Sequence, residues 1–283
     1  MRSAMGRSHG CACDGIGDGG SDVTAVAGVA FPVAVALLVI AFVGGVGITT
    51  VGPGGIFVTA ALYALTDVPP ATVAGTASAT FVATGILGAG TYLRSGELGD
   101  REGSIAAAIL SLGGVIGALV GVGLNAVISE RLFGYLLGGM LFLSGILVWW
   151  RTRDAAVERH GLDLTTWRGG SVVLLIGFTV GIPGGLLGVG GPVLAVPLLV
   201  MAGVPMLLGV GLAQVQSIWL ATGATAGYIF RDAVSWPLVV LVGVPELVGV
   251  VAGWYVAHRI DPRQLKRILA VLLVVLGPYI GLS

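Results

Sequence analysis

Long apolar stretches limit what this 283-residue chain can fold into. Seven stretches each contain no more than one ionised residue, and about twenty consecutive apolar residues cross a bilayer as a helix. A soluble core cannot bury so many. Only 10% of the residues are charged, whereas a soluble domain has about a quarter. The sequence therefore predicts an all-α integral membrane protein. The stretches are 27–46, 70–93, 105–128, 132–150, 206–230, 236–257 and 268–282.

The chain also contains an internal repeat. Residues 52–145 align without a gap on residues 188–281, at an offset of 136 positions. Seventeen of the 94 pairs are identical, against about ten expected by chance from this composition. Glycine and proline positions coincide in particular. A duplication in an apolar chain is typical of secondary transporters, whose site lies between the halves.

Each half reads as five helical segments. After a tail at 1–23, predicted to be disordered, the first transmembrane repeat is expected over 24–151. A polar linker at 152–169 then leads to the second repeat, 170–283. The segments are expected near 24–47, 54–66, 70–94, 103–128 and 131–151, and again near 170–187, 191–202, 206–230, 235–258 and 264–282.

The second segment of each half is short. About a dozen residues form roughly 18–20 Å of helix, less than the roughly 30 Å of the hydrocarbon core. These segments either re-enter the membrane as broken helices or cross it where it is thinned or where they tilt. Both readings give each half an odd number of crossings, three or five. The two halves are therefore predicted to be inverted repeats.

The distribution of positive charge indicates an orientation. If the linker is cytoplasmic, ten Lys and Arg residues lie on the cytoplasmic side and four lie outside, as the positive-inside rule requires. The prediction is a multi-pass protein of the cell membrane with a cytoplasmic linker and both termini outside.

Two glycine-rich segments are candidate substrate sites. We call residues 52–55 (GPGG) the first glycine element and residues 188–191 (GVGG) the second. Each precedes a short helix, and a helix start offers free N–H groups and a partial positive charge. Two such starts facing each other would attract an anion without a buried Lys or Arg. Alternatively, the glycines only permit a turn or tight packing. The candidate residues are Gly52, Gly54, Gly55, Gly188, Gly190 and Gly191.

Polar residues near the start of the third segment of each half could complete such a site. They are Thr76 and Ser78 in the first half and Gln214 and Ser217 in the second. In an apolar helix they serve either as hydrogen-bond donors to an anion or as contacts between helices. Gln216 is two positions from Gln214 and so points to another helix face, and Gln214 is preferred because it continues the face of Gly211.

Two further side chains lie deep in apolar segments. Glu246 is acidic at membrane depth, which is costly and marks a candidate functional site. Burial disfavours its charged form and would suit proton coupling. It could instead cap backbone freed by Pro245, and its first-half counterpart is Leu110. Trp219 is expected to pack in the core.

Several classes of function have no support in the sequence. Walker A, His-Glu-x-x-His and local Ser/His/Asp signatures are missing, so no enzyme is predicted. The glycine elements lack the context of a dinucleotide fingerprint, and no cofactor is expected. A net charge of zero does not suggest nucleic acid. Cys11 and Cys13 in the tail are a poor metal signal, and no metal site is predicted.

The second glycine element continues into GVGGPVLAVPLLVMAGVP at 188–205, which resembles the signature of the TauE/SafE sulfite-exporter family. Gly188, Gly190, Gly191, Pro197 and Leu198 fit this signature. The first repeat has Ala61 where the proline is expected, then resumes with PPATVAGTASAT, which is similar to a stretch frequent in the family. The second repeat departs from that stretch at Leu212 and Gln214, which leaves its polar contacts open.

This resemblance implies a permease for small anions, such as sulfite, organosulfonates or related carboxylates. Our first hypothesis is therefore a permease that works by alternating access between inverted repeats. A proton or a sodium ion would be the coupling ion, and Glu246 is the candidate for proton coupling. The lipid bilayer, the anion and a second copy in a homodimer are the expected partners. An anion channel and a non-transporting membrane scaffold or assembly factor remain alternatives, and substrate and direction stay open.

Overall fold

The computed structural model describes residues 26–50, 53–94, 101–151, 166–257 and 262–282. Within these ranges the regular secondary structure is helical, apart from a single bridge between Val26 and Val29, and turns and loops join the helices. The elements are α1 (Phe31–Thr50), the short 3-10 helix η1 (Pro53–Gly55), α2 (Ile56–Leu65), α3 (Pro70–Arg94), α4 (Arg101–Asn125), α5 (Glu130–Arg151), α6 (Trp167–Leu187), α7 (Pro192–Met201), α8 (Met206–Ile229), α9 (Trp236–Ala257) and α10 (Pro262–Leu282).

Six of the described helices are long and apolar enough to cross a membrane. Among the described residues, α1, α3, α4, α5, α6 and α9 contain candidate spans. Their outward faces carry large apolar side chains, for example Val39, Leu112 and Val240, which are 57%, 59% and 63% exposed. Water would disfavour such a surface, whereas lipid suits it. The predicted all-α integral membrane protein is confirmed.

Two short helices interrupt this pattern. Both α2 and α7 have ten residues, so each is about 15 Å long, roughly half the thickness of the hydrocarbon core. They follow the two glycine elements, as the sequence predicts. The first seven residues of α2 and six of the ten residues of α7 are buried, so other helices shield the start of each from lipid.

The start of the first helix differs from the expectation. The first segment was expected from about residue 24, but α1 begins at Phe31. A tight turn precedes it, in which Ala27 and Gly28 have φ of 56° and 83°. Pro32 then occupies the first turn of the helix, where its missing N–H has no intrahelical partner to lose.

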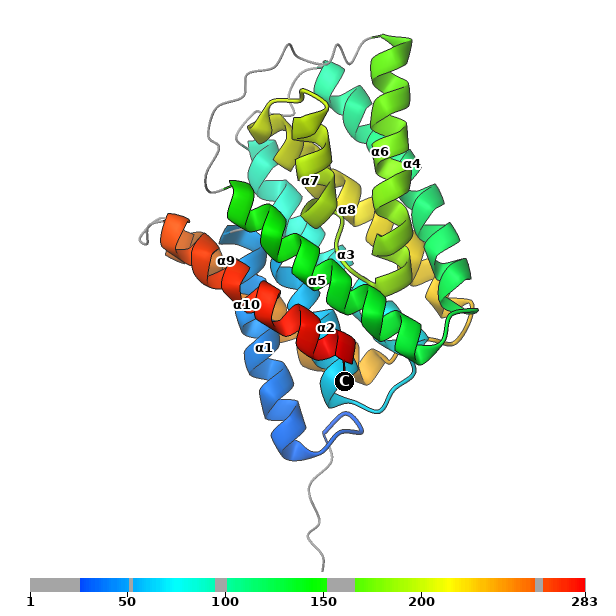
Figure 1. The fold of residues 1–283 in the computed structure, drawn as a ribbon, viewed down its shortest axis with the longest axis vertical. Coiled ribbons are helices and arrows are strands. Elements are labelled where there is room, and N and C mark those ends of the chain that lie inside the picture. Colours follow the sequence, from blue (N-terminus) through cyan, green and yellow to red (C-terminus); the bar gives the residue numbers. More distant parts are fainter. Residues whose placement is uncertain (1–25, 51–52, 95–100, 152–165, 258–261, 283) are drawn as a thin grey trace, which may run out of the picture.

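The two halves of the chain interlock. The most extensive helix contacts join α4 to α6, α1 to α9 and α5 to α10, followed by α8 to α4 and to α3. In the 136-residue repeat, α1 corresponds to α6 and α4 corresponds to α9. The contact between α1 and α9 is therefore the counterpart of the contact between α6 and α4. In Figure 1, α1 begins at the lower end of the molecule and α6 begins at the upper end. How the halves are oriented across a membrane stays a prediction.

Glycines set these equivalent contacts. A Cβ on Gly113 of α4 would lie 2.9 Å from the Phe178 N atom of α6. The equivalent Gly249 of α9 lies against α1, where its Cβ would collide with the Phe42 carbonyl. Small residues let helix backbones approach closely in lipid, so glycines at equivalent positions allow close packing in both helix pairs.

The end of α6 is fixed by side chains from two other helices. The Tyr228 hydroxyl of α8 donates to the Gly185 carbonyl at 2.7 Å, and the Asn125 amide of α4 donates to the Leu186 carbonyl at 2.7 Å. These bonds satisfy carbonyl groups that a helix end leaves without partners. They hold the second glycine element, which follows directly.

Candidate functional site

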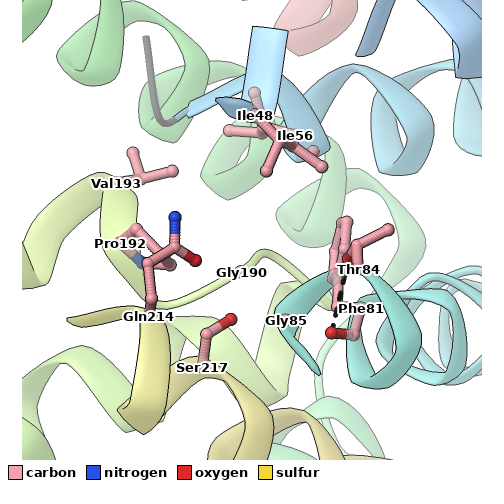
Figure 2. A pocket seen from close by; sticks show the side chains of 11 residues that line it. Ile48, Ile56, Phe81, Thr84, Gly85, Gly190, Pro192, Val193, Gln214 and Ser217 are labelled. Carbon is pink, nitrogen blue, oxygen red and sulfur yellow. Dashed lines mark hydrogen bonds between the residues drawn. The ribbon is translucent and has the colours of Figure 1, made fainter. Parts of the chain in front are cut away.

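A small pocket lies between the two glycine elements. Its volume is about 20 Å³, which is room for about one water molecule. Helices from both halves contribute to it, and Figure 2 shows the lining side chains. We call it the central pocket. Its lining residues are Ile48, Gly55, Ile56, Phe81, Thr84, Gly85, Gly190, Pro192, Val193, Gln214 and Ser217.

The second glycine element turns the chain from α6 into α7. Gly188 has φ of 63°, a left-handed conformation that favours glycine, and its N–H donates to the Gly184 carbonyl. A Cβ on Gly188 would also collide with the Ala74 carbonyl of α3. Thr59 of α2 donates to the Gly188 carbonyl at 2.7 Å. Gly188 is therefore explained by the turn and its packing.

Gly190 and Gly191 have different surroundings. A Cβ on Gly190 would meet no atom closer than 3.8 Å, where the Ser217 hydroxyl lies, and one on Gly191 would meet none closer than 3.6 Å. No side chain caps α7, and Ala195 donates to the Gly191 carbonyl in its first turn. The N–H groups before Ala195 have no partner within the helix. Gly190 lines the pocket at this helix start.

The first glycine element reaches the same pocket with tighter packing. A Cβ on Gly54 would collide with the Gly44 carbonyl and the Ile48 N atom of α1. A Cβ on Gly55 would lie 2.5 Å from the Phe81 ring. Gly55 lines the pocket where η1 leads into α2, and no side chain caps that start either. Gly52 lies outside the described residues.

Gln214 and Ser217 supply polar side chains from α8. Both are nearly buried, at 6% and 5% exposed, and Figure 2 shows them reaching toward the centre of the pocket. Gln216 points elsewhere: its amide donates to the Gly177 carbonyl of α6 at 3.4 Å. The two glutamines thus lie on different faces of α8.

The first-half candidates Thr76 and Ser78 are buried but do not line the pocket. The Thr76 hydroxyl accepts a hydrogen bond from the Ser235 N–H at 3.1 Å. This bond holds the loop before α9 against α3, so Thr76 has a structural role. The structure therefore brings Gly55, Gly190, Gln214 and Ser217 together and leaves Thr76 and Ser78 outside this group.

Sequence reasoning missed the residues of α3 that form the opposite wall. Phe81, Thr84 and Gly85 line the pocket, and Figure 2 shows them across from Gln214 and Ser217. The sequence repeat could have indicated one of them, because Phe81 is the first-half counterpart of the candidate residue Ser217. Phenylalanine in an apolar helix otherwise looks like ordinary core. Thr84 donates to the Phe81 carbonyl at 3.3 Å, so its hydroxyl also has a local partner.

The pocket combines hydrogen-bond donors with apolar walls. No Lys, Arg, Asp or Glu is among its lining residues in the part of the chain that the structure describes. Two helix starts without a side-chain cap, the Gln214 amide and the hydroxyls of Ser217 and Thr84 line a space that is otherwise bounded by apolar residues. Helix starts carry a partial positive charge, which favours an anion over a cation.

Glu246 is not part of the pocket. It is fully buried on α9, and neither carboxylate oxygen has a hydrogen-bond partner among the described residues. The predicted burial of this side chain is therefore observed, and its surroundings are the packed contacts among α1, α3 and α9.

Comparison with known proteins gives the family. Residues 36–280 match the family described as Sulfite exporter TauE/SafE. The chain is also 29% identical over 202 residues to the "Probable membrane transporter protein YdhB" of Bacillus subtilis (strain 168), an alignment that covers 71% of this chain and 80% of that protein. No solved structure matches the chain. Because the family match extends over most of the chain, this protein belongs to the sulfite exporter TauE/SafE family of membrane transporters.

Proposed function

We propose that the protein is a permease for small anions such as sulfite, organosulfonates or related carboxylates. One observation carries the proposal: the starts of α2 and α7, from different halves, meet at one pocket beside Gln214 and Ser217. Membership of the sulfite exporter family agrees with an anion that carries several acceptor oxygens. Backbone N–H groups, an amide and a hydroxyl would donate to those oxygens.

The described lining residues include no charged side chain, which suits transport. An anion held by partial charges is bound less tightly than one paired with a buried Arg, and a carrier must release its cargo. At about 20 Å³ the pocket is too small for a sulfite ion, so its walls must separate for binding. We propose alternating access, in which the two interlocked halves move and open the pocket to each side in turn.

The location of the protein, its orientation in the membrane and its oligomeric state are also proposed. The cell membrane would hold the protein with residues 152–169 in the cytoplasm and both termini outside, which places ten of fourteen Lys and Arg residues inside. A homodimer is compatible with this arrangement. Because the same pocket opens to each side in turn, glycine substitutions at the central pocket would impair transport in both directions.

Purified protein in proteoliposomes tests the proposal. We expect saturable uptake of sulfite or sulfoacetate, with sulfate as a third substrate, above the rate of empty liposomes. Radiolabelled or fluorometric uptake, with and without a pH gradient, measures it. Very fast flux that rises linearly with concentration would favour a channel. Lack of flux for all three anions would leave a scaffold or assembly factor.

Gln214→Leu is expected to raise KM for the transported anion by about ten- to a hundredfold. A hydrogen bond to a charged group contributes about 1.5–3 kcal/mol, and leucine keeps the size of the side chain without the donor. Thr222→Val on the same helix is the matched control, because Thr222 is exposed and bonds only within α8 to the Ile218 carbonyl. An unchanged KM in Gln214→Leu would remove this residue from the site.

A further inference from the structure

A buried acid lies one helix away from the central pocket. Glu246 is 0% exposed, and in the described part of the chain neither of its carboxylate oxygens has a hydrogen-bond partner. A charged carboxylate without a partner is very costly in such a place, so this packed arrangement suits only the neutral, protonated acid.

The helices around Glu246 are tightly packed. A Cβ on Gly45 of α1 would collide with the Glu246 carbonyl, which leaves no space between α1 and α9. On the other side, α3 contributes Thr80, whose side chain interacts with the carboxyl group. The Thr80 hydroxyl, however, donates to the Ala77 carbonyl at 3.0 Å. The carboxyl group thus faces one hydroxyl that is already engaged.

No other ionisable group faces this carboxyl among the described side chains. The sequence of α1 contains no ionisable residue. On α3, Tyr92 and Arg94 lie near the far end, beyond the described side chains. On α9 the other ionisable residue is Tyr255, which is 60% exposed. The protonation of Glu246 therefore depends on burial and on access of water.

The equivalent junction in the other half lacks the acid. There, Leu110 takes the position of Glu246, and Gln216 takes that of Thr80. Leu110 is also fully buried, so a leucine fills this place in the same kind of helix contact. Packing alone therefore does not require an acid at position 246.

The junction is connected to the central pocket through two helices. Thr80 is followed by Phe81, which lines the pocket, and Thr84 of the next turn donates to the Phe81 carbonyl at 3.3 Å. On α1, Ile48 lines the pocket three residues after Gly45. A separation of α9 from α1 and α3 would therefore move two of the pocket walls.

Resting on the proposed anion transport, we propose that Glu246 couples it to proton movement. The protonated acid stabilises the closed contact of α1, α3 and α9. Water that enters when these helices separate accepts the proton, and the carboxylate keeps them apart until it is protonated again. A hard cation such as sodium needs several oxygen ligands. Among the described side chains, Thr80 is the polar neighbour of this carboxyl group, so the site suits a proton better than sodium.

The test measures anion and proton movement together in proteoliposomes loaded with a pH-sensitive dye. For the wild-type protein, sulfite or sulfoacetate uptake should be accompanied by proton movement without added sodium. Glu246→Gln should lose substrate-driven proton movement and accumulation in a pH gradient, yet keep exchange of labelled for unlabelled anion. Glu130→Gln, at an exposed helix start, is the control and should behave as the wild type.

The outcomes separate the two proposals. Anion uptake by the wild type without proton movement, or uptake that requires sodium, would overturn proton coupling and leave the permease intact. The same holds if Glu246→Gln still moves protons with the anion. Lack of anion uptake by the wild type would overturn both. If Glu246→Gln fails to fold, proton movement during anion uptake by the wild-type protein still tests the proposal.

Discussion

Gly190→Val is expected to abolish anion transport while the protein still folds. A Cβ at this position would meet no atom closer than 3.8 Å, and the backbone does not have the positive φ that would exclude valine. The added side chain would fill a pocket of about 20 Å³ beside Ser217 and cover the start of α7. We therefore expect uptake to fall to the level of empty liposomes.

Gly139→Val is the matched control. Gly139 is exposed on α5, and a Cβ there would meet nothing within 4 Å. Both variants should elute as a single species in size-exclusion chromatography and should unfold at the temperature of the wild type. Normal uptake by Gly190→Val would remove the central pocket from the transport path.

Gly54→Ala is expected to destabilise the protein strongly. The new methyl group would collide with the Gly44 carbonyl and the Ile48 N atom, which belong to the backbone of α1 and cannot rotate away. Overpacking of this kind costs about 1–3 kcal/mol, and more where backbone must shift. The thermal unfolding temperature in detergent and the yield of monodisperse protein measure the effect.

Gly190→Ala is the control for this second prediction, because the repeat places position 190 on position 54. Its methyl group has space, so its unfolding temperature should match that of the wild type. Equal stability of the two alanine variants would contradict the contact between η1 and α1.

Gly54 and Gly190 show how much of the structure the sequence repeat can predict. The sequence presents them as equivalents, and both lie in elements that precede a short helix. Only their neighbours separate them: Gly54 lies against a helix backbone, whereas Gly190 faces the pocket. Tight packing therefore explains Gly54, whereas the anion site at Gly190 stays a proposal.

The faces of the helices could not be predicted, because these helices are apolar on nearly all sides. Periodicity assigns a buried face only when the other face is polar. Trp219 was expected in the core, yet it is 56% exposed, and this expectation was wrong. In the same way, Thr76 and Gln214 look alike as polar residues of an apolar helix. The first bonds to the loop before α9, and the second lines the pocket.

The sequence by itself determined the membrane class, the 136-residue repeat, the two short helices and the family, because hydrophobic length and glycine spacing are local properties of the chain. Only the tertiary structure decided which residues share the central pocket. It brought Phe81 and Thr84 opposite Gln214 and Ser217, and it enclosed Glu246 between α1 and α3. The physical reason is that contacts between halves depend on which glycines let two backbones touch, and that depends on partners distant in the chain.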